Sequence, residues 1–308
     1  MAEKIATRQA YGQVLVELGE KYDNLVVMDA DLSKSTMTAD FGKSFPDRFF
    51  NMGIAEQNLY GSATGLAMSG KIVCASTFAM FAAGRAFEII RNSIGYPHAN
   101  VKICATHAGI TVGEDGASHQ TFEDIALMRT IPGMTVINPG DAVSAKELMR
   151  QAVAFQGPAY VRLGRAAVPV LYDANSKIEI GKGHCLREGN DYTIIATGIL
   201  VSEAMMAAET LAAEGIDVRV IDMHTIKPID QEIIIKAAKE TKGIVTAEEH
   251  SVIGGLGAAV AEVVCQHAPV KMAMVGQKDT FGESGKPDEL KKKYGMTADD
   301  IVAAVKSL

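Results

Sequence analysis

The sequence predicts an α/β protein made of two domains, each built on a mostly parallel β-sheet. Short apolar runs alternate with longer segments of helical period, and this order produces parallel strands covered by helices on both faces. The 308 residues suffice for two domains of roughly 100–200 residues each. The 29 glycines and 9 prolines are typical of an α/β protein with many tight turns between strands and helices.

The elements of the first domain follow from the spacing of its apolar residues. Tyr11, Val14, Leu15 and Leu18 recur as one helix face does, which indicates an amphipathic helix. Short apolar runs then predict strands at 25–29, 48–50, 71–75, 101–106, 134–137 and 159–162. Longer segments between those runs predict helices at 58–68, 78–93 and 142–155.

A domain boundary is expected near residue 185, which gives domains at 1–185 and 186–308. The stretch 170–190 has charged turns, several glycines and no helical period. The alternation then restarts, with strands expected at 192–196, 218–221 and 244–247 and helices at 201–211 and 256–266.

The segment from Gly254 to Val260 is glycine-rich and looks like a dinucleotide-binding loop. Val260 stands where that motif needs glycine or alanine, so close helix–strand packing is the favoured interpretation.

Composition excludes several classes of function. The net charge is −7 and there is no basic stripe, which argues against nucleic acid or an anionic membrane as a partner. No apolar run reaches the roughly 20 residues that span a bilayer. Cys74, Cys104, Cys185 and Cys265 are not spaced as a metal site, so no metal ligands are predicted and the cysteines are expected to be core residues. We expect a cytoplasmic protein.

Two polar or aromatic segments directly follow strands, where open α/β sheets bind ligands. In the segment 51–58, Glu56 falls in the first turn of a helix. There it is either a carboxylate stabilised by the helix dipole or a functional acid. In the segment 76–81, Phe78 and Phe81 are three residues apart on one expected helix face. They fit either core packing or a slot for a flat ring.

The densest segment is the glycine-rich loop 105–120, which contains His107, Asp115 and His119. A metal site there is conceivable, but the spacing matches no common zinc pattern. Side chains that could bind an anion are scattered more widely, and they matter only if the fold brings them to one mouth: Arg8, Ser35, His107, Arg162 and Arg165.

Four motifs, in this order, resemble the transketolase family: 53–58 (Gly-Ile-Ala-Glu-Gln-Asn), 76–81 (Ser-Thr-Phe-Ala-Met-Phe), 113–120 (Gly-Glu-Asp-Gly-Ala-Ser-His-Gln) and 247–251 (Ala-Glu-Glu-His-Ser). Each motif alone is weak, but four in register are specific. The resemblance covers essentially the whole chain and corresponds to the pyrimidine-binding domain followed by the transketolase C-terminal domain. No segment resembles the family's diphosphate-binding domain. We therefore expect the C-terminal section of a split transketolase.

The resemblance implies roles for individual residues. Glu56 would hydrogen-bond the aminopyrimidine of thiamine diphosphate, and Phe78 and Phe81 would flank that ring. The family often has a third aromatic residue where this chain has Gly84. Asp115 would contact the acceptor sugar and His119 the donor sugar. The phosphate of the sugar would be bound by Arg8, Ser35, His107 and Arg165, with Arg162 as the alternative to Arg165.

The resemblance also implies an activity and partners. The enzyme would transfer a two-carbon ketol unit from a ketose phosphate to an aldose phosphate, as in the pentose phosphate pathway. A separate N-terminal subunit would hold the diphosphate and Mg²⁺, and the pyrimidine domains would self-associate to give a heterotetramer. Three alternatives are a 2-oxo-acid dehydrogenase β subunit, a half of a 1-deoxyxylulose-5-phosphate synthase, and a non-catalytic subunit. The synthase usually carries arginine at the position of His107, which favours transketolase.

Overall fold

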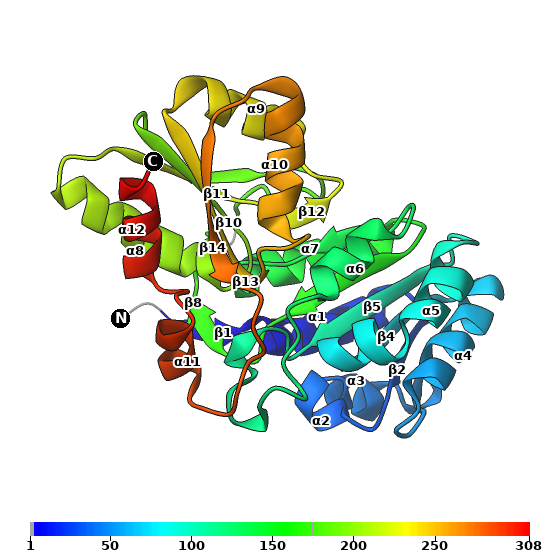
Figure 1. The fold of residues 1–308 in the computed structure, drawn as a ribbon. Coiled ribbons are helices and arrows are strands. Elements are labelled where there is room, and N and C mark those ends of the chain that lie inside the picture. The colour runs from blue at the N-terminus through cyan, green and yellow to red at the C-terminus, as the bar shows by residue number, and fades with distance from the viewer. Residues whose placement is uncertain (1–2, 174) are drawn as a thin grey trace.

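The first domain is built on a seven-stranded sheet that is parallel except at one edge (Figure 1). The computed structural model describes residues 3–173 and 175–308. The sheet has the order β12-β6-β7-β5-β4-β2-β3. Its strands are β2 (Leu25–Asp29), β3 (Phe49–Asn51), β4 (Ile72–Phe78), β5 (Val101–Thr106), β6 (Thr135–Ile137), β7 (Ala159–Leu163) and β12 (Thr225–Lys227). Strand β12 comes from the second half of the chain and pairs antiparallel with β6.

Helices cover both faces of this sheet, as the sequence predicts. Residues of β2 alternate between the faces: Leu25 and Val27 pack with one group of helices, and Val26 and Met28 with the other. The first group is α1 (Thr7–Lys21), α3 (Ala39–Ser44) and α7 (Ala142–Ala154). The second includes α4 (Glu56–Met68), η2 (Phe81–Arg85), η3 (Ile90–Gly95) and α6 (Asp124–Thr130). The shorter elements are α2 (Ser33–Thr36), η1 (Pro46–Arg48), α5 (Phe87–Ile89) and η4 (Ile110–Asp115).

The second domain has a five-stranded sheet in the order β14-β13-β10-β11-β9. These strands are β9 (His184–Arg187), β10 (Tyr192–Ala196), β11 (Val218–Asp222), β13 (Gly243–Ser251) and β14 (Lys271–Gln277), and β9 alone of these runs antiparallel to its neighbour. Its helices are α8 (Leu200–Ala213), α9 (Gln231–Glu240), α10 (Leu256–His267), α11 (Pro287–Lys293) and α12 (Ala298–Lys306). A small ribbon joins β1 (Lys4–Ala6) to β8 (Ala167–Pro169). The fold class is confirmed.

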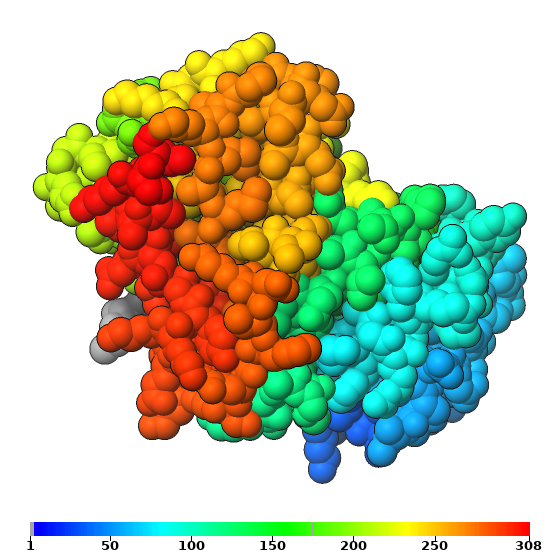
Figure 2. Space-filling model, in the orientation of Figure 1, coloured from blue at the N-terminus to red at the C-terminus, as the bar shows by residue number. Residues whose placement is uncertain are grey.

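The two domains share packed surfaces. One hydrophobic cluster contains Val136 of the first sheet together with Ile221 and Leu256 of the second domain. In the space-filling view the orange and red C-terminal part of the chain lies against its green middle (Figure 2). Strand β9 begins at His184 and pairs with β11, so the second sheet includes residues just before the boundary expected near 185. The boundary itself stays a prediction.

Three sequence predictions differ from the structure. The helix expected at 78–93 begins one residue late, because β4 continues to Phe78, and two π-helical segments lie on either side of α5. Strand β13 continues through Glu248 to Ser251, past its expected end at 247, because its charged side chains find buried partners. Cys74 and Cys104 are core residues, but Cys265 is exposed. Among the residues described, no helix is both long and apolar enough to cross a membrane.

Candidate active site

The aromatic and histidine side chains of the motifs gather at the carboxyl ends of β4 and β5. Phe78 ends β4 and His107 follows β5, and their ring centroids lie 3.9 Å apart. Phe81 lies 5.9 Å from Phe78, with the ring planes 16° apart, and His119 meets the edge of Phe81 at 5.3 Å. Phe78 and His107 are 29 residues apart in sequence, so the fold brings separate segments into one ring cluster.

The two phenylalanines form one wall rather than two. A ring inserted between parallel rings needs about 7 Å, which is two van der Waals separations. The centroid separation of 5.9 Å between Phe78 and Phe81 is too small. They therefore do not flank a slot in this arrangement, and their contact with a cofactor stays a prediction. The side chain of Met80 lies over Gly84, where the family often places a third aromatic residue.

Glu56 is a buried acid at the start of α4. Its side chain is 2% exposed, and Arg85 Nη1 lies 3.1 Å from Glu56 Oε2. The Arg85 guanidinium in turn lies 5.0 Å from the Phe81 ring centroid. A cavity of about 320 Å³ opens beside the pair. Sequence reasoning missed Arg85, although its spacing of four from Phe81 indicates a shared helix face.

Two arginines share a small cavity near His107. Arg8 and Arg165 line a cavity of about 250 Å³. Arg8 Nη1 donates to the Ser35 carbonyl at 2.6 Å, so the described contact of Ser35 is through its backbone. Arg8 Nε is buried without a hydrogen-bond partner among the described residues. Arg165 donates to the Val112 carbonyl and, at 2.9 Å, to a carboxylate oxygen of Glu114.

The positive charge at this cavity comes from the two arginines and not from His107. Burial and then the charges of Arg8, Arg165 and His119 lower the pKa of His107 to about 3. His107 is therefore neutral near pH 7, and it can bind an anion only as a hydrogen-bond donor. Burial and Arg165 also lower the pKa of Arg8 from its ordinary value. The cavity is lined by two guanidinium groups and one carboxylate, that of Glu114, so its charge is still net positive and favours an anionic ligand.

Arg162 is not an alternative to Arg165, so that expectation is wrong. Arg162 is buried, and its Nε donates to Asp124 Oδ2 at 2.8 Å. Its Nη2 donates to the Glu249 carbonyl at 2.8 Å. Burial opposes its charge, but Asp124 and then Glu249 outweigh that effect and raise its pKa above the ordinary value.

Asp115 and His119 lie on the loop between β5 and α6. Asp115 is exposed at the end of η4, and His119 is half-buried, with its Nδ1 3.0 Å from Ser118 Oγ. The structure therefore places His119 in the ring cluster. No described contact ties Asp115 to that cluster, so its role stays a prediction.

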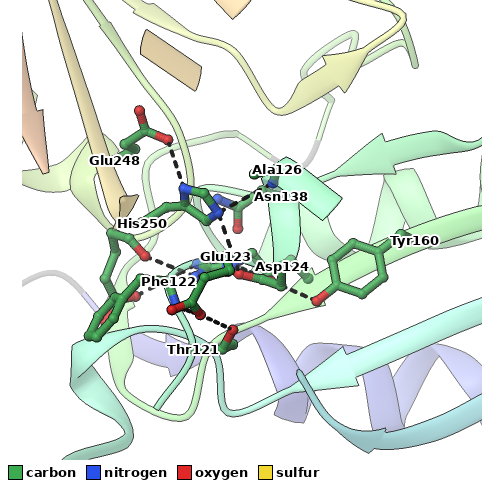
Figure 3. A network of polar contacts seen from close by, with 12 residues as sticks. Thr121, Phe122, Glu123, Asp124, Ala126, Asn138, Tyr160, Glu248 and His250 are labelled. Carbon is green, nitrogen blue, oxygen red and sulfur yellow. Dashed lines mark hydrogen bonds and ion pairs between the residues drawn. The ribbon is translucent and has the colours of Figure 1, made fainter. Parts of the chain in front are cut away.

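A buried polar network joins the loop to the second domain (Figure 3). His250 lies between Glu248, 3.7 Å away, and Asp124, 3.9 Å away. Tyr160 donates to Asp124 at 2.6 Å. The carboxylate of Glu248 accepts from the backbone N–H groups at the start of α10, which confirms close helix–strand packing there. Sequence reasoning placed Glu248, Glu249 and His250 in a motif but gave them no role.

Comparison with known proteins identifies both domains. The family model described as "Transketolase, pyrimidine binding domain" matches residues 3–170, and "Transketolase, C-terminal domain" matches 181–301. A protein of Methanocaldococcus jannaschii named "Putative transketolase C-terminal section" is 55% identical over 97% of this chain and 94% of its own length. A 6-deoxy-6-sulfo-D-fructose transketolase subunit of a Clostridium species is 42% identical over 96% of this chain and 92% of its own length.

A solved structure and a full-length relative match the same two domains. A structure described as "Split gene transketolase, inactive beta4 tetramer" superposes with a TM-score of 0.93 and 57% identity, covering 98% of each chain. Human transketolase is 37% identical over all of this chain but only 50% of its own length. The chain therefore belongs to the transketolase family, of which it contains the pyrimidine-binding and C-terminal domains.

Proposed function

We propose that this chain is the C-terminal subunit of a thiamine-diphosphate-dependent transketolase. It would transfer a two-carbon ketol unit from a ketose phosphate to an aldose phosphate, together with a subunit that binds the diphosphate. The observation that carries the proposal is the buried carboxylate of Glu56. It opens on a cavity and is linked through Arg85 to the ring cluster. Two relatives are themselves named as a section or a subunit of a transketolase. No observation favours the dehydrogenase, synthase or non-catalytic alternatives.

The residues around Glu56 fit the aminopyrimidine half of the cofactor. When bound, thiamine diphosphate supplies a carbon nucleophile. Glu56 Oε would share a proton with a ring nitrogen, which a carboxylate shielded from water does well. Arg85 is 52% exposed, so it can move aside into solvent when a ring approaches Glu56. Phe78 and His119 would shield the ring from water.

The cavity between Arg8 and Arg165 fits the terminal phosphate of a sugar. We expect Arg165→Ala to raise the KM for phosphorylated sugars about tenfold or more, because a hydrogen bond to a charged group contributes about 1.5–3 kcal/mol. Unphosphorylated acceptors should be much less affected. Steady-state kinetics with both acceptor types checks this. The matched control is Arg150→Ala, since Arg150 pairs with Glu17 on the surface. An equal penalty for both acceptor types would contradict a phosphate role.

We further propose that the pyrimidine domains self-associate through the exposed face of α4. Gly61 and Gly65 are exposed and four residues apart, and a Cβ added at either position would meet nothing within 4 Å. Two glycines four residues apart lie on one face of the helix, and without side chains there the backbone of a second helix can approach closely. A two-fold pairing of this kind would give two equal sites.

Substituting both glycines tests this surface. Gly61→Leu with Gly65→Leu should leave the fold intact, because leucine is the better helix former by about 0.8 kcal/mol per residue. The added side chains should instead block helix approach and shift the chain toward a monomer in sedimentation velocity. Ala212→Leu, on the exposed face of α8, is the control for added surface area. An unchanged assembly state in the double variant would exclude α4 as the contact.

A further inference from the structure

The loop 109–120, called the substrate loop below, has a backbone that depends on outside support. Gly109, Gly113 and Gly116 have φ angles of 78°, 81° and 75°. Residues other than glycine rarely adopt a backbone conformation with positive φ. The helical geometry of η4 is also broken at Gly113. The loop has turn hydrogen bonds of its own, such as His119 N–H to the Gly116 carbonyl, but no continuous helical ladder, so contacts with neighbouring elements also determine its position.

Glu249 reaches the substrate loop from the second domain. Its Oε1 accepts a hydrogen bond from the Thr111 backbone N–H at 2.6 Å, across 138 residues of sequence. Both residues are buried. A Cβ on Gly109 would collide with the Glu249 carboxylate, so glycine lets the loop backbone lie directly against it. The start of the loop is therefore held by a side chain of β13.

Arg162 fixes Glu249 in turn. It donates to the Glu249 carbonyl, and its Nη1 lies 3.9 Å from Glu249 Oε2. Asp124 holds the other side of the same guanidinium. Burial raises the pKa of Glu249, and the charge of Arg162 opposes that rise. Glu249 is therefore held at both its main chain and its side chain, which makes it a rigid support.

The end of the substrate loop is also held by the second domain. Gln120 Nε2 donates to the Glu283 carbonyl at 2.9 Å, and Gln120 is buried. Helix α11 packs against η4 (Figure 1). In sequence, Asp115 and His119 lie between the two held residues, Thr111 and Gln120.

We propose that Glu249 is a positioning residue for sugar binding. It sets the position of the substrate loop from the second domain and touches neither sugar nor cofactor. The inference rests on the proposed function, since it requires Asp115 and His119 to contact the sugar. It gives the second domain a part in substrate binding.

Two substitutions test separately the length and the charge of the Glu249 side chain. Glu249→Asp keeps the charge beside Arg162 but withdraws the carboxylate from Thr111 N by one methylene. Glu249→Gln keeps the reach and an acceptor oxygen but loses the charge. In the complex with the partner subunit, Glu249→Asp should raise the KM for both sugars about tenfold, the loss of one hydrogen bond to a charged group. Glu249→Gln should raise the KM only about threefold or less, because its amide oxygen still accepts a hydrogen bond from Thr111 N, although a neutral acceptor binds more weakly than a charged one. The Kd for thiamine diphosphate should be unchanged in both variants.

A second readout does not depend on catalysis. Hydrogen exchange at the Thr111 amide should become faster in Glu249→Asp and stay slow in Glu249→Gln. The control is Asp230→Ala, which removes another buried acid of the second domain, one that caps α9 and contacts Gly183 instead of the substrate loop. It should lower the melting temperature without changing the KM for sugars.

Several results would overturn the positioning role: an unchanged KM or unchanged Thr111 exchange in Glu249→Asp, or an equal KM rise in Asp230→Ala. If Glu249→Asp fails to fold, a tenfold KM rise in Glu249→Gln, which keeps the acceptor, would also overturn it. Failure of the proposed function is distinguishable. In that case Asp115→Asn and His119→Asn would leave the KM unchanged, while Thr111 exchange would still respond to Glu249→Asp.

Discussion

Glu56→Ala is expected to abolish turnover by the proposed two-subunit enzyme while leaving the chain folded. A general acid or base contributes about 10²–10⁴-fold to rate, and in the proposed reaction this carboxylate would act at the first step. Folding should survive because the partner left behind, Arg85, is 52% exposed and can be hydrated by solvent. The loss of a favourable charge at the start of α4 costs only about 0.3–1 kcal/mol. Turnover and melting temperature, measured on the same preparation, check both halves of this expectation.

Two further variants sharpen this test. Glu56→Gln keeps the size and one acceptor oxygen but cannot take up a proton, so it should be nearly as inactive as alanine. Gln57→Ala changes the exposed neighbouring residue and should keep nearly full activity. Near-normal turnover in Glu56→Ala would remove Glu56 from the mechanism.

The second large effect concerns the chain without its partner. We expect it neither to bind thiamine diphosphate tightly nor to turn over sugars. The aminopyrimidine would meet Glu56 and the ring cluster, but the diphosphate needs Mg²⁺ with oxygen ligands. The formal net charge of −7 opposes a bare diphosphate. Those ligands are therefore expected from the diphosphate-binding subunit.

Calorimetric titration with thiamine diphosphate and Mg²⁺ measures this directly, first on the chain alone and then after the partner is added. Binding and activity should appear together when both subunits are present. The Glu56→Ala chain mixed with the partner serves as the control for activity carried by the partner itself. Full transketolase activity from the chain alone would contradict the division of the site between two subunits.

Much of the fold could be predicted because strands covered on both faces have continuous apolar sequences. The runs at 25–29 and 101–106 became β2 and β5 with the expected bounds. The region 78–93 could not be predicted as well, because π-helical turns do not follow the 3.6-residue period. Its first residue, Phe78, also belongs to β4, whose apolar pattern does not mark where the strand stops.

The candidate site likewise contains residues that the sequence could predict and contacts that it could not. Its motif residues could be found because they follow strand ends, where open sheets place their ligands. Arg162 and Arg165 could not be separated, because the sequence does not fix whether β7 ends at 162 or 163. The structure places Arg162 inside β7 and Arg165 beyond it. The contact of Glu249 with Thr111 joins positions 138 residues apart, and no local pattern reports such a pair.

Strand β12 has a consequence for how the chain can be divided. It belongs by sequence to the second domain but completes the edge of the first sheet beside β6. A polypeptide cut between the domains would leave β6 with a row of unpaired backbone groups, a template for aggregation. The cut would also divide a hydrophobic cluster to which both halves contribute. The two homology domains therefore share a sheet and a hydrophobic cluster, so we expect them to unfold together rather than one after the other.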